Sequence, residues 1–414
     1  MSQWNLGVLP RSLELIVGLS IFSTVAGGGV VRHVASTSLV VLLVTSFFYI
    51  RSWPKAWQQL TSVEQLVLIG FGLYVLSAFL SYYNVSDVDE YIKHLGKYAR
   101  FLAVVPVYLL ISRFNLRLFP YMLAGAIVAG PLYIGAAIQS IAQNPGHPAK
   151  GYYHHITFGD MAMLSAIFMI TVLLVMKTNK IMKIALVISI ICVLYASVLS
   201  QARGAWLALP LCLGLLLYVA VHYKKIKIWV ALILPALLVM VVALSPASDI
   251  VSNRWHKAVN DVVDYQSGEK IFTSVGVRLA MWDVAVDVWK NHPIIGTGPG
   301  DFDQEMQSDE VQNIYKNMPA FSSTHNIFIQ SIATTGTIGF VILILALFVF
   351  PFRLFYSMRE KGALNVASLS GMVTLLAFAV FGLTESWILR APMVSVYLIY
   401  TVTLMSTVSR EAGV

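Results

Sequence analysis

Charged residues are scarce in this sequence: aspartate, glutamate, lysine and arginine make up 12% of its 414 residues, and 58% are hydrophobic. A soluble domain of this size carries far more charge on its surface, so the composition excludes a soluble globular protein. The long apolar runs also lack the alternation of a membrane β-barrel strand. We therefore expect an all-α protein that crosses a membrane many times.

Cysteine is nearly absent as well, because only Cys192 and Cys212 occur, both inside hydrophobic runs. Such cysteines indicate packing rather than a disulfide framework or a metal site. A positively charged n-region and a small-residue cleavage site are also missing, so we expect the first helix to be retained rather than cleaved. No HExxH, CxxC or Ser-His-Asp spacing occurs, which leaves soluble-hydrolase chemistry without support.

Hydrophobic runs dominate the chain, and a window of about 20 residues separates twelve of them as candidate membrane spans. They lie near residues 12–30, 34–50, 64–83, 100–113, 118–141, 156–176, 181–200, 204–222, 227–245, 326–352, 363–384 and 391–408. An even number of spans puts both termini on one side of the membrane. We expect nine spans in residues 1–245, a polar segment at residues 246–325, and three further spans in residues 326–414.

The basic residues of the short loops gather on the side that holds both termini. By the positive-inside rule this side is cytoplasmic, so the polar segment faces outwards. The net charge of +8 follows from the same asymmetry, and nucleic acid is not an expected partner.

One amphipathic helix of the polar segment, expected at residues 277–290, has an arginine on its apolar face. Counted from Arg278 at 100° per residue, Asp283, Asp287 and Lys290 fall at about 140°, 180° and 120°. The charged face therefore lies opposite Arg278. A guanidinium in that position needs an anion, which is either a ligand or an acid of the same segment.

Arg203 lies in the shortest outer connection, a tight turn between two hydrophobic runs. Its guanidinium either reaches the phospholipid headgroups or binds a ligand phosphate, whose oxygens match its planar fork of donors. Arg278 offers the same chemistry on the same side of the membrane. Two arginines suit a pyrophosphate better than a single phosphate.

His325 stands where the polar segment ends and a hydrophobic helix begins, directly after the hydroxyl run Ser322–Thr324. An imidazole at this position can accept a proton from a hydroxyl nucleophile. The alternative is a histidine that only hydrogen-bonds at the start of the helix.

Weaker signals occupy other outer loops. The glycine-rich stretch around Gly298 fits an anion-binding nest or a plain turn, and the turn is favoured because no strand precedes it. The acidic pair of Asp301–Asp303 resembles a metal site, but the surrounding acids favour a solvated face. The adjacent histidines His154–His155 point apart on a helix, which disfavours a metal, and Glu385 is expected to pair with Arg390.

Three motifs follow one another in the second half of the chain: Arg203-x-x-x-Leu207, His292-Pro293-x-x-Gly296-x-Gly298-x-Gly300-x-Phe302, and His325-Asn326-x-x-x-Gln330 with Gly336 and Gly339 beyond. Together with twelve spans and a long outer loop, they resemble the O-antigen ligase and polymerase family of bacterial envelope-glycan enzymes, most closely the ligases. The motif detail covers residues 200–340. Thr335 departs from the pattern, since members often carry an acid there, and no role of that acid transfers.

The resemblance implies a GT-C-like fold in the bacterial inner membrane, among membrane lipids. It implies transfer of a glycan from undecaprenyl pyrophosphate to a sugar hydroxyl of lipid A–core at the periplasmic face, which forms lipopolysaccharide without a metal or other cofactor. The matching positions give Arg203 and Arg278 as pyrophosphate binders and His325 as the catalytic histidine. Gly298 and Asn326 are implied as further substrate contacts.

Three other functions stay open. A polymerase that lengthens the glycan and an oligosaccharyltransferase that modifies protein hydroxyls share these motifs, because the motifs do not specify the acceptor. A transporter of lipid-linked glycans needs charges along a midplane path and broken helices in paired halves. Asp160 is the main interior charge and no internal repeat is found, so the sequence favours an enzyme.

Overall fold

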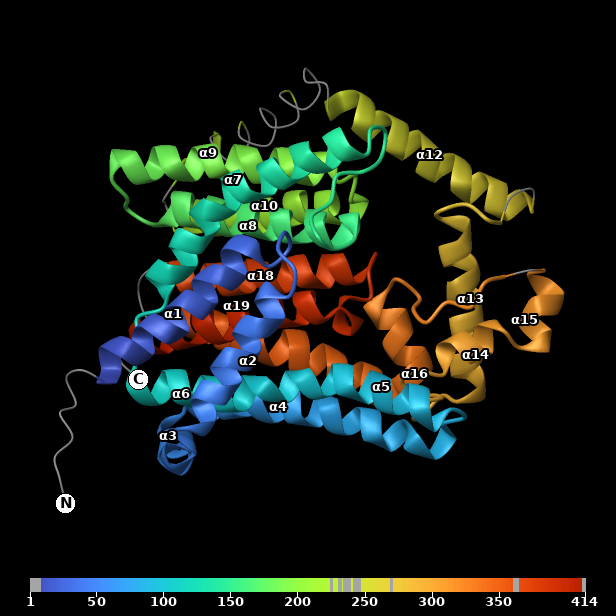
Figure 1. The fold of residues 1–414 in the computed structure, drawn as a ribbon, viewed down its shortest axis with the longest axis horizontal. Helices are drawn as coiled ribbons and strands as arrows, with labels where there is room; N and C mark the ends of the chain where they lie inside the picture. Colours follow the sequence, from blue (N-terminus) through green and yellow to red (C-terminus); the bar gives the residue numbers. More distant parts are fainter. Residues whose placement is uncertain are drawn as a thin grey trace.

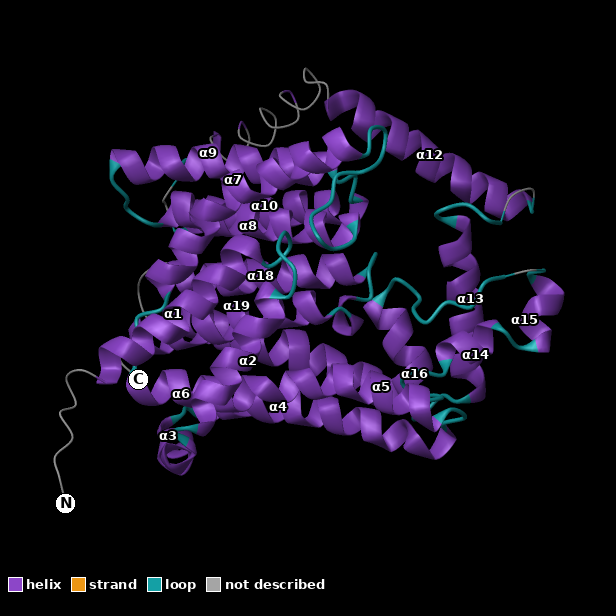
Figure 2. Cartoon of the chain, in the orientation of Figure 1, coloured by secondary structure: helices purple, strands orange, loops and turns teal. Residues whose placement is uncertain are grey.

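The computed structural model describes residues 9–223, 226–229, 233, 240, 247–268, 271–316, 318–359 and 365–411. Every regular element in these ranges is a helix, as Figure 2 shows, and the expected all-α class is confirmed. The hydrophobic run expected at residues 227–245 falls mostly outside the described residues.

The helices follow one another with short connections (Figure 1). In chain order they are α1 (Leu9–Gly27), α2 (Val34–Phe47), α3 (Trp53–Gln59), α4 (Ser62–Leu80), α5 (Val88–Ala99), α6 (Val104–Phe114), α7 (Phe119–Gln143), α8 (His155–Val175), α9 (Lys180–Leu199), α10 (Arg203–His222), α12 (Ala247–Ser267), α13 (Gly276–Asn291), α14 (Phe302–Met306), α15 (Asp309–Ile314), α16 (Ile327–Ile344), α17 (Phe350–Arg359), α18 (Val366–Gly382) and α19 (Ala391–Glu411).

Eight helices in the described ranges are long and apolar enough to cross a membrane, or up to nine if one bent pair counts as a span. The expected number of twelve is not confirmed. The bent pair is α2 with the helix Ile50–Gln59, which meet at 66°, and α18 has only 17 residues. The span expected at residues 100–113 is longer than predicted, because α5 and α6 together run from Val88 to Phe114.

The middle of the bundle consists of α8, α18 and α19, in which α18 packs against both α8 and α19. Of the helices that can span a membrane, α8 and α19 are the most buried. Figure 1 shows helices α12–α15 of the polar segment at the opposite end of the bundle from the start of α1 and the end of α19.

α16 is broken at Gly336, where φ is 64° and ψ is −170°. The break frees the carbonyl groups of Ala333 and Thr334, which accept hydrogen bonds from the backbone of Thr297 and Gly298 at 3.3 and 2.9 Å. Irregular backbone in an apolar helix is tolerated where other protein groups satisfy it. The glycine-rich turn thus completes the broken helix, and the N–H groups of Thr297 and Gly298 point at α16 rather than at an anion.

Two glycines allow this junction, because two backbones touch there. A Cβ on Gly336 would lie 2.4 Å from backbone atoms of Ile294, and a Cβ on Gly296 would lie 2.4 Å from the carbonyl carbon of Thr334. Both glycines also have positive φ, which other residues adopt at a cost. The glycines of the sequence motifs therefore fix the polar segment to α16.

The hydrophobic core has two separate parts. The larger part runs through the helix bundle, and the smaller one joins α13, α14 and α16 through residues such as Met281, Phe302 and Ala333. The indole N–H of Trp282 also donates to the carbonyl oxygen of Thr324 at 2.9 Å. The smaller core thus holds α13 beside the chain that leads into α16.

Gly204 of α10 lies directly against the side chain of Thr384, which follows α18: an added Cβ would lie 1.9 Å from Thr384 Oγ1. We expect Gly204→Ala to destabilise the protein by about 1–3 kcal/mol through overpacking, measured as a lower Tm in detergent. Gly214→Ala is the control, because nothing lies within 4 Å of its Cβ. Adding Thr384→Ala should restore part of the loss, and no recovery would contradict this explanation.

Candidate active site

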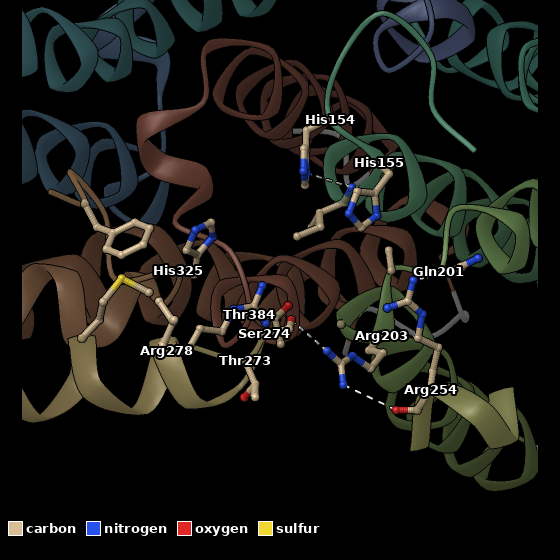
Figure 3. A pocket seen from close by; sticks show the side chains of 16 residues that line it. His154, His155, Gln201, Arg203, Arg254, Thr273, Ser274, Arg278, His325 and Thr384 are labelled. Carbon is tan, nitrogen blue, oxygen red and sulfur yellow. Dashed lines mark hydrogen bonds between the residues drawn. The ribbon is translucent and has the colours of Figure 1, made fainter. Parts of the chain in front are cut away.

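A cavity of about 400 Å³ lies at the end of the bundle that carries the polar segment. Its walls come from the start of α8, the turn before α10, the helices α12 and α13, the chain before α16 and the chain after α18. Arg203, Arg278 and His325 all line it, as Figure 3 shows. The three residues predicted to carry the chemistry therefore meet in one place, although they are far apart in sequence.

Arg203 is half-buried at the first position of α10, after a turn in which Gln201 has a φ of 57°. Its two terminal nitrogens donate to the carbonyl oxygen of Arg254 at 3.5 Å and to Ser274 Oγ at 3.3 Å. Both contacts are long, and neither partner is charged. The guanidinium thus keeps its charge available to the cavity.

Arg278 lies on the inner side of α13, as the helical spacing predicted. The neighbouring positions Ala280, Met281 and Val284 are buried against the smaller core. Burial lowers the pKa of the Arg278 guanidinium, the carboxylate of Glu385 opposes this effect, and the charge of Arg203 adds to it. A guanidinium still remains protonated at any physiological pH.

No salt bridge to either arginine occurs among the described residues, where the ion pairs involve other cations. The alternative for Arg278 is a salt bridge with an acid of the polar segment. No such salt bridge forms among the described residues. Two guanidinium groups that have no acid partner among the described residues therefore face one cavity.

His325 is the third functional candidate, and it has a left-handed backbone with a φ of 53°. Such a conformation is uncommon for residues other than glycine and costs roughly 1–2 kcal/mol. The Nδ1 atom of the imidazole lies 3.1 Å from Glu385 Oε2, and Glu385 Oε1 accepts from Arg390 Nε at 2.9 Å. The expected Glu385–Arg390 pair thus forms, and it includes His325 as a third member.

The carboxyl group of Glu385 is buried, with 3% of its side chain exposed. Burial raises its pKa, but the hydrogen bond from His325 and the charge of Arg390 outweigh that effect and lower the pKa to about 2. Glu385 is therefore ionised at neutral pH. An ionised carboxylate favours the imidazole tautomer with its proton on Nδ1, which leaves Nε2 as the acceptor.

This low pKa predicts a loss of stability in acid. The pKa of Glu385 falls from an ordinary value of 4.5 to about 2 on folding, so its stabilisation is present above pH 4.5 and disappears as the pH falls towards 2. By linkage, the shift contributes about 3 kcal/mol. We expect Glu385→Gln to flatten the decline of Tm below pH 4.5, whereas Glu310→Gln, at an exposed acid, should leave it unchanged. Identical pH profiles for Glu385→Gln and the unmodified protein would contradict the assignment.

The lining of the cavity also contains groups that the sequence marked only weakly or not at all. His154 caps α8, and His155 Nδ1 lies 2.8 Å from the carbonyl oxygen of Ser200. Burial lowers the pKa of His154, and the carboxylate of Glu385 opposes this. Arg254 of α12 donates to the side chain of Gln201 (Figure 3). The sequence did not identify Arg254, because Arg254 lies outside the motifs and its contact with the turn before α10 joins residues that are far apart in the chain.

Gly298 and Asn326, expected as substrate contacts, are not among the described residues that line the cavity. Gly298 belongs to the junction with α16. Asn326 is buried, and its side-chain oxygen accepts from the backbone of Phe328 and Ile329 at 2.9 and 3.2 Å, which caps α16. Both positions of the motif therefore have structural roles.

The solvated face expected around Asp301 is wrong for that residue. Asp301 is buried, and its Oδ2 accepts from the backbone N–H and the hydroxyl of Ser86 at 2.8 and 2.9 Å. The carboxylate thus fastens the chain before α5 to the polar segment. No group of three or more metal-ligating side chains gathers in the described residues.

Part of the sequence matches a known protein family. The O-antigen ligase family model matches residues 188–344. The chain carries an O-antigen ligase family domain. This confirms the resemblance drawn from the motifs, and the ligase-family domain contains Arg203, Arg278 and His325. Glu385, the partner of His325, lies outside it.

A relative from Haemophilus influenzae, named only as an uncharacterised protein, is 26% identical over 313 residues. The match covers 74% of this chain and 76% of that protein. The ligase-family domain at residues 188–344 and the apolar helices together support a multi-pass membrane protein. The matched domain implies lipid-linked glycans as the class of substrate.

Proposed function

We propose that the protein is an O-antigen ligase that transfers a glycan from undecaprenyl pyrophosphate to a sugar hydroxyl of lipid A–core. The observation that carries this proposal is the meeting of Arg203, Arg278 and His325 in one cavity at the edge of the helix bundle. Paired guanidinium groups recognise the diphosphate of the donor, and an imidazole activates the acceptor.

The two arginines act on the leaving group. When the acceptor oxygen attacks the anomeric carbon, the bond between that carbon and the phosphate oxygen breaks, and negative charge grows on the pyrophosphate. Fixed cations aimed at this group stabilise the transition state more than the ground state. Because Arg203 and Arg278 have no acid partner among the described residues, their charge is directed to the ligand.

His325 acts on the acceptor. With Nδ1–H donated to Glu385, Nε2 accepts the proton of the attacking hydroxyl, and the ionised carboxylate stabilises the resulting imidazolium. The proton then passes to solvent, which resets the histidine. Attack from the side opposite the pyrophosphate inverts the anomeric carbon.

The same proposal includes the membrane arrangement. The polar segment, residues 246–325, faces the periplasm, and the termini face the cytoplasm. This is supported by the basic residues near the termini and by the position of α12–α15 at the end opposite to the start of α1. The flanking parts, residues 1–245 and 326–414, form the membrane bundle.

Glycan transfer by the purified chain in detergent tests the proposal. The mixture contains a lipid-linked donor, lipid A–core and a chelator, so that metal dependence is measured as well. We expect modified lipid A–core, formed in the presence of the chelator. Lengthened donor glycans with unmodified lipid A–core would identify a polymerase, and a modified protein acceptor would identify an oligosaccharyltransferase. If no glycan is transferred but the donor crosses the bilayer of a liposome that contains the protein, the protein is a transporter.

A further inference from the structure

A second cavity, of about 450 Å³, lies at the other end of the bundle, between the ends of α3, α6 and α19. Figure 1 places these ends opposite α12–α15, so this cavity is separate from the candidate active site. Most of its lining side chains are polar, which is unusual beside apolar membrane helices. A polar cavity there needs a polar occupant.

Two arginines line it, Arg113 at the end of α6 and Arg410 at the end of α19. Neither forms a salt bridge with an acid in the described part of the chain. The Nε atom of Arg410 is buried and has no hydrogen-bond partner among the described residues. A buried donor of this kind is expected to have a partner, and next to a second guanidinium that partner is an anion.

The buried acid that contacts residues of this cavity already has hydrogen-bond partners. Glu64 accepts hydrogen bonds from the backbone N–H of Thr61 at 2.7 Å and from Ser409 Oγ at 2.7 Å, and also from the hydroxyl of Tyr108. Tyr108 and Ser409 also line the cavity. Because both donate their hydroxyl hydrogen atoms to Glu64, its negative charge is stabilised by these hydrogen bonds and not directed into the cavity. The arginines thus remain the charged groups that face the cavity.

The side chains of Gln59 and Asn115 add neutral donors to the same lining. We propose that this cavity binds a phosphate group, carried by an anionic phospholipid or free in solution. A phosphate matches the fork of a guanidinium, and the cavity has room for a glycerol phosphate headgroup. Bound there, it links the end of α19 to the ends of α3 and α6 and stabilises the folded chain.

The test uses the full chain in detergent. Thermal unfolding is measured against sodium phosphate, with sodium chloride at the same ionic strength as the reference. In a second arm, native mass spectrometry counts phosphatidylglycerol and diacylglycerol retained by the protein. Retention of about one phosphatidylglycerol without diacylglycerol would identify a lipid headgroup, and a rise of Tm with phosphate alone would identify free phosphate. In either case Arg410→Gln and Arg113→Gln should weaken binding roughly tenfold each.

Arg51→Gln is the matched control, because Arg51 is an exposed arginine at the same end of the bundle and outside the cavity. It should bind like the unmodified protein. An equal loss in Arg51→Gln, or no binding in both arms, would overturn the proposal. Arg113 is exposed, so Arg113→Gln should fold normally even if Arg410→Gln does not.

Discussion

Replacing His325 with alanine is expected to lower kcat for glycan transfer roughly 10²- to 10⁴-fold, the usual contribution of a positioned general base. KM for the donor should change little, because the imidazole acts on the acceptor hydroxyl rather than on the pyrophosphate. Rates from purified variants at saturating donor, followed across pH 5 to 9, measure both quantities. Glu385→Gln should cause a smaller loss of kcat and shift the pH profile, since it changes the base only through its hydrogen bond.

The comparison separates catalysis from folding. His325 has an uncommon left-handed backbone, so His325→Ala must first be shown to unfold cooperatively, with a Tm near that of the unmodified protein. His292→Ala is a useful reference, because His292 lies in the same polar segment but is not among the described residues of the cavity. A His325→Ala variant that keeps most of its kcat would rule out the proposed base.

Arg278→Ala is expected to lower kcat by roughly 10²- to 10³-fold, the effect of removing one donor to a developing anion. Arg203→Ala should behave similarly. The double variant should lose less than the product of the two single losses, because both groups are proposed to contact one pyrophosphate. Arg278→Lys should have a kcat between those of Arg278→Ala and the unmodified protein, since an ammonium group lacks the planar fork of a guanidinium.

Lys290→Gln is the matched control for Arg278, because Lys290 lies on the same helix, is exposed at 62% of its side chain and pairs with Asp287. It should leave kcat unchanged. If Arg278→Ala instead raises KM for the donor at constant kcat, the arginine binds the ground state and the transition state equally. The leaving-group role would then be wrong.

The sequence predicted what depends on spacing within one helix. The inward position of Arg278 follows from the angles of its own helix, and the structure places that side chain in the cavity. The contact between His325 and Glu385 joins residues 60 positions apart. Periodicity shows which face of a helix is buried, but it does not show which residue lies across from it.

Local composition misled at Asp301. The acids around it indicated solvent, but Ser86 comes from a distant loop and covers the carboxylate. The deciding contact therefore comes from a part of the chain that local composition does not include. The expected number of twelve spans is not confirmed, since α18 has only 17 residues and the run at residues 227–245 falls mostly outside the described residues.

Because the core has two parts, we expect loss of the cavity and unfolding of the bundle to be separate events in this protein. One wall of the cavity belongs to the large bundle, and the other belongs to α12 and α13, of which α13 rests on the smaller core. Small, exposed units open at a lower free energy than the main core. We therefore expect heat or a harsh detergent to move Arg278 away from His325 while the bundle is still helical, so that helix content would overstate the fraction of protein with an intact cavity.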